Sequence, residues 1–183
     1  MSQTVSPTAR PARIAIVTVS DRASRGEYKD KGGPGAEDWL RATITSPMQI
    51  SRQIIPDGRA SVADTLRDLA DSGADLILIT GGTGPAPRDE TPEGMADVMQ
   101  KELPGFGEEM RRASLREVPT AILSRQTAGI RGSTLMITIP GKPSAIATCL
   151  DAVFAAVPYC LDLIGAARIE TDPARIAAFR PKT

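Results

Sequence analysis

The sequence predicts an α/β domain built around a largely parallel β-sheet. Two observations predict this class: short runs rich in β-branched residues alternate with segments of helical periodicity, and two of the runs are continuously apolar, as in strands covered on both faces. The length of 183 residues suits one domain, and the content of 41% apolar and 24% charged residues is that of an ordinary globular protein.

We expect four strands. Arg13–Val19 is dense in β-branched residues, and Gln49–Ile55 partly alternates between polar and apolar positions. Asp75–Thr80 and Leu135–Ile139 are the two short, continuously apolar runs.

Four helical patterns lie between and after these strands. Ala36–Ile44 and Ala60–Ser72 carry apolar residues at helical spacing, and Ser144–Val157 is mostly apolar, which indicates a well-buried helix. Thr91–Leu103 opens with a threonine that is an N-cap candidate, followed by a proline suited to the first helical position.

The composition restricts the chemistry. The chain has no histidine, which excludes Ser-His-Asp hydrolysis, histidine-bound zinc and histidine acid–base catalysis. The formal net charge is zero, with 22 basic and 22 acidic residues, and argues against binding of nucleic acid by bulk electrostatics. Cys149 and Cys160 have no metal-ligand spacing, and the apolar helical pattern around Cys149 favours a reduced, buried thiol.

Both ends of the chain are expected to lie outside the folded domain. Residues 1–12 contain two prolines and no apolar segment of a signal peptide, and so predict a flexible N-terminal tail before a single domain over 13–166. Residues 167–183 are expected to form a peripheral C-terminal tail that docks through Ile176 and Phe179. No apolar run is expected to approach membrane-spanning length, so we expect a cytoplasmic protein without membrane or nucleic-acid partners.

Glycine-rich segments follow two of the predicted strands. Ligands of parallel sheets gather beyond the carboxyl ends of the strands, where this chain has "SDRASRGEYKDKGGPG", "PDG", "GGTGPAPRDETPE" and "PGKPS". Gly81–Gly84 matches neither a Walker A motif nor GxGxxG, but it can turn tightly and direct amide groups at an anion. Pro140–Ser144 offers a helix N-terminus and a lysine to a phosphate, and equally fits a plain helix cap.

Acidic residues follow three of the predicted strands at the same edge, at Asp21, Asp30, Asp57 and Asp89. Each one taken singly fits a turn or cap aspartate. Taken together, beside two candidate anion sites, they favour Mg²⁺, which binds one or two carboxylates plus phosphate oxygens. Arg88, next to Asp89, equally fits a solvated surface pair. The basic residues that could neutralise phosphate charge are Arg22, Lys31, Arg88, Arg125 and Lys142.

Five stretches together resemble the MogA/MoaB family of molybdenum-cofactor biosynthesis proteins. They are "VSDRASRGEYKDKGGP", "LITGGTGPAPRDETPE", "ELPGFGEEMRRASL", "PTAILSRQTAGIRGSTLMITIPGKPSA" and "VPYCLDLI", and the resemblance extends over roughly residues 13–165. "PGFGEEMR" with "AILSR" is closer to the MogA branch. The run from "PGKP" to "VPYC" lacks an insertion that some MogA proteins carry, which leaves the branch open. The resemblance implies a three-layer α/β/α sandwich that is usually trimeric.

The resemblance also implies an activity and a site. Family members bind molybdopterin and MgATP and adenylylate molybdopterin with release of pyrophosphate, so Mg²⁺, ATP and a hand-off to a MoeA-type molybdenum insertase are expected. By the same analogy Asp57 and Asp89 are the catalytic acids. Our hypothesis for their roles is that Asp89 holds the metal and Asp57 is a second ligand or positioning acid. The implied substrate-binding residues are Ser20, Asp21, Asp30, Gly81, Gly82, Thr83, Gly84, Glu108, Glu109, Ser114, Ser124, Arg125, Pro140, Gly141, Lys142, Pro143 and Ser144.

The implied reaction suits a chain without histidine. The nucleophile would be the terminal phosphate of molybdopterin, whose second pKa of about 6 makes a general base unnecessary. The protein then has to align the reactants and neutralise charge. Two other classes stay open: a carrier that holds molybdopterin without reacting, and a CinA-type nucleotide-processing relative. The two acids disfavour the carrier, because negative charge beside a phosphate contributes nothing to binding without a metal.

Overall fold

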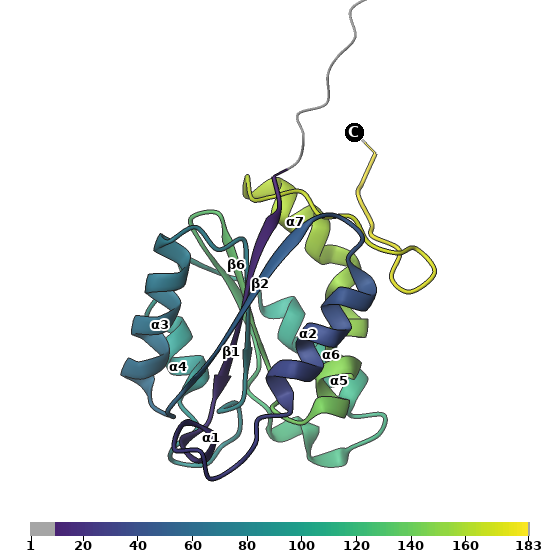
Figure 1. Ribbon diagram of the computed structural model, residues 1–183. Helices are drawn as coiled ribbons and strands as arrows, with labels where there is room; N and C mark the ends of the chain where they lie inside the picture. The colour runs from purple at the N-terminus through teal and green to yellow at the C-terminus, as the bar shows by residue number, and fades with distance from the viewer. Residues whose placement is uncertain (1–9, 183) are drawn as a thin grey trace, which may run out of the picture.

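Four parallel strands form the larger part of the sheet in the computed structural model, which describes residues 10–182 (Figure 1). They are β1 (Ala12–Val19), β2 (Met48–Ile55), β3 (Leu76–Thr80) and β6 (Thr134–Ile139). The order across the whole sheet is β2-β1-β3-β6-β5-β4. All four predicted strands are confirmed, and each ends at the predicted residue.

Two short strands that the sequence did not predict extend the sheet beyond β6: the first pairs antiparallel with β6, and the second pairs antiparallel with the first. They are β5 (Ala128–Arg131) and β4 (Lys101–Glu102). Both are too short to show a strand pattern, and both residues of β4 are exposed. Gly129 allows the close pairing, because a Cβ there would lie 2.7 Å from the sulfur of Met99 and 3.0 Å from the carbonyl oxygen of Lys101.

Helices cover both faces of this sheet, which confirms the three-layer α/β/α sandwich (Figure 1). Period-two alternation in β1 explains this, since Ile14 and Ile16 pack on one side of the sheet and Ala15 and Val17 on the other. Burial of each large aliphatic side chain stabilises the fold by about 1.5–3 kcal/mol. One face carries α2 (Gly32–Thr43), α5 (Pro104–Ser114), α6 (Pro143–Val153) and α7 (Val157–Leu163), and the other carries α3 (Arg59–Asp71) and α4 (Thr91–Ala96).

Shorter helical segments lie at the edges of these layers. They are α1 (Asp21–Ser24) and two 3₁₀ helices, η1 (Pro119–Leu123) and η2 (Phe154–Ala156). The predicted helix Ser144–Val157 is thus correct in position, but η2 interrupts it before α7 begins. The helix α5 was not predicted.

The predicted helix Thr91–Leu103 is wrong in its second half. The chain leaves the helix after Ala96, turns, and enters β4, so the apolar spacing beyond that residue reflects side chains buried in a turn. Thr91 is also not an N-cap. It lies within the first turn of α4, and its hydroxyl is buried without a hydrogen-bond partner among the described residues.

The helical run Pro143–Leu163 corrects the expectation that no apolar segment approaches membrane-spanning length. It has 21 residues, and its most apolar window has a mean hydropathy of 1.6, which meets the length and composition of a membrane span. Of that window, 44% is buried inside the domain. Ile146, Leu150 and Leu161 of this run belong to the larger core cluster, so in this structure the run is a core helix.

Asp75 joins the beginning of the described chain to its C-terminal part. The guanidinium of Arg10 donates to both carboxylate oxygens, at 2.8 and 2.6 Å, and the amides of Arg13 and Ala167 donate to them at 2.8 Å each. Residues 1–9 of the predicted N-terminal tail, and residue 183, lie outside the described residues. The division at residues 12 and 166 stays a prediction.

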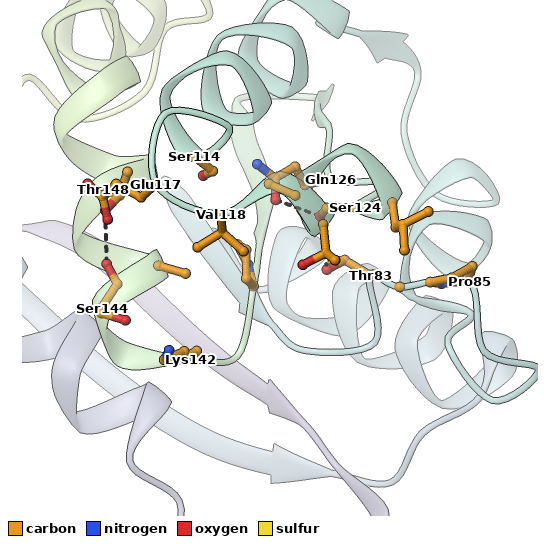
Figure 2. Close-up of a pocket in the computed structure, with 16 residues that line it drawn as sticks. Thr83, Pro85, Ser114, Glu117, Val118, Ser124, Gln126, Lys142, Ser144 and Thr148 are labelled. Carbon is orange, nitrogen blue, oxygen red and sulfur yellow. Dashed lines mark hydrogen bonds between the residues drawn. The ribbon is translucent and has the colours of Figure 1, made fainter.

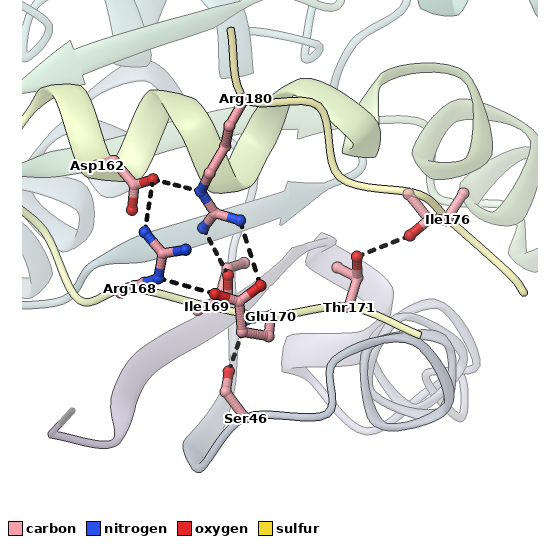
Figure 3. Close-up of polar contacts among 8 residues, drawn as sticks. All are labelled: Ser46, Asp162, Arg168, Ile169, Glu170, Thr171, Ile176 and Arg180. Carbon is pink, nitrogen blue, oxygen red and sulfur yellow. Dashed lines mark hydrogen bonds and ion pairs between the residues drawn. The ribbon is translucent and has the colours of Figure 1, made fainter. Parts of the chain in front are cut away.

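The segment after residue 166 contacts the domain at several points. Ala167 and Ile169 are buried in the core, and Ile176 packs against it. Arg180 donates to Asp162 of α7 at 2.5 Å and to the carbonyl oxygen of Ile169 at 2.9 Å (Figure 3). Docking through Phe179, by contrast, was a wrong prediction, because this side chain is 68% exposed.

Candidate functional site

The carboxyl ends of the four parallel strands meet at one edge of the sheet. Thr80 is paired with both Thr18 and Ile139, and Val19 is paired with Ile55, so the strands end side by side. The four loops that the sequence analysis singled out therefore begin at the same edge, as predicted.

The glycine loop starts with two residues in left-handed backbone conformations. The φ angles are +95° at Gly81 and +63° at Gly82, a region that favours glycine. A Cβ on Gly81 would lie 2.5 Å from the carbonyl oxygen of Val19, and one on Gly82 would lie 2.2 Å from Thr91 Oγ1. A Cβ on Gly141 would lie 3.6 Å from the Cα of Gly81, so the two glycine-containing loops are in contact.

A cavity of about 400 Å³ opens beside these loops (Figure 2). It lies between the glycine loop, the segment from the end of α5 through η1 to residue 126, and the start of α6. The predicted residues that line it are Thr83, Gly84, Ser114, Ser124, Pro140, Lys142 and Ser144. The lining residues that the prediction missed are Pro85, Glu117, Val118, Thr120, Ala121, Leu123, Gln126, Ala145 and Thr148.

The missed residues follow a pattern. Most belong to the segment 117–126, and Val118 and Leu123 are 46% and 53% exposed although they are large and apolar. Exposed apolar side chains next to a cavity suit the faces of a flat ring. The sequence signal for Leu123 and Gln126 was their place next to Ser124 inside a stretch that resembles the MogA/MoaB family, whereas Val118 lies just before that stretch.

A chain of polar groups forms one wall of the cavity. Ser124 Oγ donates to Gln126 Oε1 at 2.7 Å, and Gln126 Nε2 donates to the sulfur of Cys149 at 3.5 Å (Figure 2 shows the first bond). Ser114 Oγ lies 3.7 Å from the same sulfur. Cys149 is a free, buried cysteine, as predicted, and burial raises the pKa of its thiol, so it stays protonated near neutral pH.

The N-terminus of α6 faces the same cavity. Lys142 is the N-cap residue and makes no side-chain cap bond, and Pro143 is the first helical residue. The amides of Ser144 and Ala145 lie in the first turn, where a helix offers its N–H groups no intrahelical acceptor. Lys142, Ser144 and Ala145 all line the cavity, and a lysine beside free amides at a helix N-terminus is suited to an anion.

Asp57 and Asp89 lie in the loops at this edge but do not line the cavity. The amide of Asp21 donates to Asp57 Oδ2 at 2.9 Å, and the amide of Asp57 donates to Asp21 Oδ1 at 3.0 Å. Asp89 Oδ2 accepts from the amide of Ala86 at 3.1 Å. Each of the two predicted catalytic acids thus has one carboxylate oxygen held by the backbone.

The other predicted acids have local partners. Asp30 accepts from the hydroxyl of Thr18 at 2.8 Å and from the amide of Gly32 at 2.9 Å, as a cap does. Glu109 pairs with Arg112 at 2.5 Å on an outer face of α5. Glu108 is exposed, and Ser20 caps α1 by accepting from the amide of Ala23 at 3.2 Å.

Among residues 10–182, no three acidic or cysteine side chains lie close enough together to hold a metal ion by themselves.

Arg125 is the predicted basic residue whose contacts the structure defines best. Its Nε donates to the carbonyl oxygen of Gly84 at 3.0 Å, its Nη2 donates to the carbonyl oxygen of Asp89, and its Nη1 pairs with Glu93. The guanidinium therefore binds the glycine-rich loop. It is not among the residues that line the cavity.

Fold and site together define an α/β protein with a cavity at the carboxyl edge of a mostly parallel sheet, the place where proteins of this architecture bind their ligands. Comparison with known proteins gives the family. The family model described as "Probable molybdopterin binding domain" matches residues 15–159, and the chain belongs to this molybdenum-cofactor biosynthesis family.

Similar proteins cover almost the whole chain. The molybdopterin adenylyltransferase of Escherichia coli (strain K12) is 46% identical over 184 aligned positions, which cover 93% of this chain and 94% of the relative. The molybdopterin adenylyltransferase of Helicobacter pylori (strain J99) is 48% identical over 170 positions, covering 92% and 97%. Among solved structures, the molybdopterin biosynthesis enzyme MoaB of Thermus thermophilus is 40% identical, with a TM-score of 0.76 and coverage of 84% and 96%.

Proposed function

We propose that this protein is a molybdopterin adenylyltransferase of molybdenum-cofactor biosynthesis. It is a nucleotidyltransferase, and its reaction joins the adenylyl group of ATP to molybdopterin and releases pyrophosphate. The observation that carries the proposal is the identity of 46% and 48% to enzymes of this name along more than nine-tenths of the chain. The cavity beside two glycine-containing loops supports it, because the substrates are a pterin and polyphosphates.

The cavity suits the pterin part of molybdopterin. Val118 and Leu123 offer apolar surface to the ring faces, and Ser114 and Ser124 offer hydrogen-bond partners to the ring edge, with Gln126 bonded to Ser124. The volume of about 400 Å³ falls within the usual range for small-molecule sites.

Phosphate groups then lie at the mouth of the cavity. Lys142 and the free amides at the start of α6 bind negative charge there, and the glycine loop leaves room for a phosphate to approach the backbone. An oxygen of the molybdopterin phosphate attacks the α-phosphorus of ATP. A new P–O–P bond forms, and the bond from the α-phosphorus to the bridging oxygen breaks, so that pyrophosphate leaves with the electron pair. No general base is required, because the attacking phosphate is already largely deprotonated at neutral pH.

The two aspartates fit Mg²⁺ as the expected ion. Asp57 Oδ1 and Asp89 Oδ1 have no hydrogen-bond partner within residues 10–182, and each carboxylate is oriented by a backbone amide through its other oxygen. Hard carboxylate oxygens, few in number, suit an ion that completes its shell with substrate phosphates. Asp89 would hold the ion and Asp57 would be a second ligand or positioning acid. When bound, Mg²⁺ would neutralise charge on the phosphates.

The proposal extends to a cytoplasmic homotrimer that passes its product to a MoeA-type molybdenum insertase, as the family resemblance implies. Exposed apolar side chains support self-association: Ile122, Leu163 and Phe179 are 69%, 67% and 68% exposed. Light scattering tests the assembly. A mass three times that of the chain supports the trimer, and a monomer at micromolar concentration contradicts it.

The activity is tested by incubating the protein with molybdopterin and MgATP. We expect adenylyl-molybdopterin and pyrophosphate in equal amounts. Binding of molybdopterin without turnover would favour a carrier. Consumption of a nucleotide without molybdopterin would favour a CinA-type nucleotide-processing protein.

A further inference from the structure

We propose that Arg125 is a positioning residue that holds the loop 83–93 and, through it, Asp89, and that it is not a ligand of the substrate phosphates. The inference rests on the proposed function only where it concerns catalysis. The evidence for the inference is the set of hydrogen bonds that Arg125 makes.

Arg125 contacts both ends of this loop. Its backbone amide donates to the carbonyl oxygen of Thr83 at 2.8 Å, and its Nε donates to the carbonyl oxygen of Gly84 at 3.0 Å. Beyond the turn, Nη2 donates to the carbonyl oxygen of Asp89 and Nη1 pairs with Glu93 in the first turn of α4. One side chain thus bridges residues that are nine positions apart.

The tip of the loop has little else to hold it. Residues 85–88 are all exposed, so apolar burial contributes little to their position. Within the loop, Asp89 and Ala86 exchange two hydrogen bonds: the amide of Asp89 donates to the carbonyl oxygen of Ala86 at 2.9 Å, and the amide of Ala86 donates to Asp89 Oδ2 at 3.1 Å. These local bonds shape the turn, but they do not attach it to the domain. At the base of the loop, the amide of Thr91 donates to the carbonyl oxygen of Gly82 and the amide of Arg59 donates to Glu90 Oε2, at 3.1 Å each. Arg125 attaches Gly84 and Asp89, the two residues that flank the exposed tip.

The ion pair with Glu93 fixes the guanidinium for this task. Partial burial opposes ionisation of Glu93, but the hydrogen bond from Arg125, a backbone hydrogen bond and the charges of Arg125 and Arg59 together outweigh it, so the pKa of this carboxyl is lowered and it is ionised at neutral pH. A guanidinium is planar and directs several N–H groups in fixed directions. Because Glu93 fixes the orientation of Nη1, the Nε and Nη2 groups point at the carbonyl oxygens of Gly84 and Asp89 and donate to them.

The arrangement distinguishes two roles for Arg125. A phosphate ligand would direct its N–H groups at the ligand, and its removal would weaken substrate binding. A positioning residue acts through Asp89, so its removal lowers kcat with little change in KM, and it matters only while Asp89 is present.

Kinetics of Arg125→Gln, Asp89→Asn and the double variant test this. We expect Arg125→Gln to lower kcat by about tenfold or more while KM for ATP and for molybdopterin changes less than about threefold. In the Asp89→Asn background the same substitution should change kcat less than about threefold. Arg125→Lys keeps the charge but not the planar fork, and should lie near Arg125→Gln. A rise in KM with kcat retained, or full additivity with Asp89→Asn, would overturn the proposal, as would full activity of Arg125→Lys.

Hydrogen exchange provides a readout that needs no substrate. The amides of Ala86 and Asp89 should exchange about tenfold faster in Arg125→Gln than in the wild type, with no change in the strands of the sheet. Arg67→Gln on α3, where Arg67 pairs with Asp64 at 2.9 Å, is the matched control and should leave exchange in the loop unchanged. Unchanged exchange of Ala86 and Asp89 in Arg125→Gln would overturn the inference. Inactivity of the wild type would contradict the proposed function instead, and this exchange test would still stand.

Discussion

Substitution of Gly82 by alanine tests whether the glycine loop is as closely packed as the structure shows. Alanine at a φ of +63° has a strained backbone, which costs about 1–2 kcal/mol. Its Cβ would also lie 2.2 Å from Thr91 Oγ1, and such overpacking costs about 1–3 kcal/mol. We therefore expect Gly82→Ala to lower the free energy of unfolding by about 2–5 kcal/mol.

Two further variants separate these contributions. Gly132 also has a positive φ, of +55°, but a Cβ there would meet no atom within 4 Å, so Gly132→Ala should cost only the backbone part, about 1–2 kcal/mol. In a Thr91→Ala background the hydroxyl is absent, and the nearest atom to the new Cβ of residue 82 is the Cβ of residue 91, at 3.3 Å. Gly82→Ala should then destabilise the fold about as much as Gly132→Ala.

Urea unfolding gives these free energies, and the m-value shows whether the unfolding stays two-state. Adenylylation should fall with Gly82→Ala and stay near the wild-type rate with Gly132→Ala, which lies in the turn between β5 and β6. If Gly82→Ala were no more destabilising than Gly132→Ala, the close contact of the glycine loop with α4 would be refuted.

Three other outcomes are expected. Lys142→Ala should raise KM for a phosphate-bearing substrate by about tenfold, more at low salt than at high salt, and an unchanged KM would contradict the anion site at the start of α6. Removal of Mg²⁺ with a chelator should abolish adenylylation but leave binding of molybdopterin measurable by calorimetry; full activity without divalent ions would contradict the roles of Asp57 and Asp89. Asp75→Asn should destabilise the fold at neutral pH. Although burial raises the pKa of Asp75, its bonds from Arg10 and two backbone amides outweigh this, so the folded-state pKa lies below the ordinary value of 3.8. That stabilisation is present above pH 3.8 and is lost as the pH falls through the folded-state pKa. The free energies of unfolding of the wild type and of Asp75→Asn should therefore become equal in acid. A difference that persists at low pH would contradict this role of Asp75.

The sequence predicted the centre of the fold because strong local patterns determine it. β1, β3 and β6 have enough consecutive β-forming residues to be recognised without tertiary information, and β2 shows a partial alternation of polar and apolar residues. β4 and β5 carry no such pattern: β5 forms because β6 offers a free edge for pairing, and β4 then pairs with β5. The C-terminal half of the expected helix Thr91–Leu103 failed for a related reason: apolar spacing does not distinguish a helix from a buried turn.

The site was predicted in its residue types more than in its geometry. Glycines at strand ends, and the lysine before α6, could be inferred from backbone chemistry alone. Val118 and Gln126 could not, because they reach the cavity only through the path of the chain between α5 and β5. The role of Arg125 was equally hidden, since its partners lie 32 to 41 positions away in the sequence.

Transfer of label from ATP to molybdopterin tests the central claim most directly. The protein is incubated with molybdopterin, Mg²⁺ and ATP labelled at either the α- or the γ-phosphorus. Our account predicts that α-label appears in a molybdopterin product in proportion to pyrophosphate released, and that γ-label appears only in pyrophosphate. Molybdopterin that binds tightly but gains no α-label, or that gains γ-label, would contradict the assignment as an adenylyltransferase.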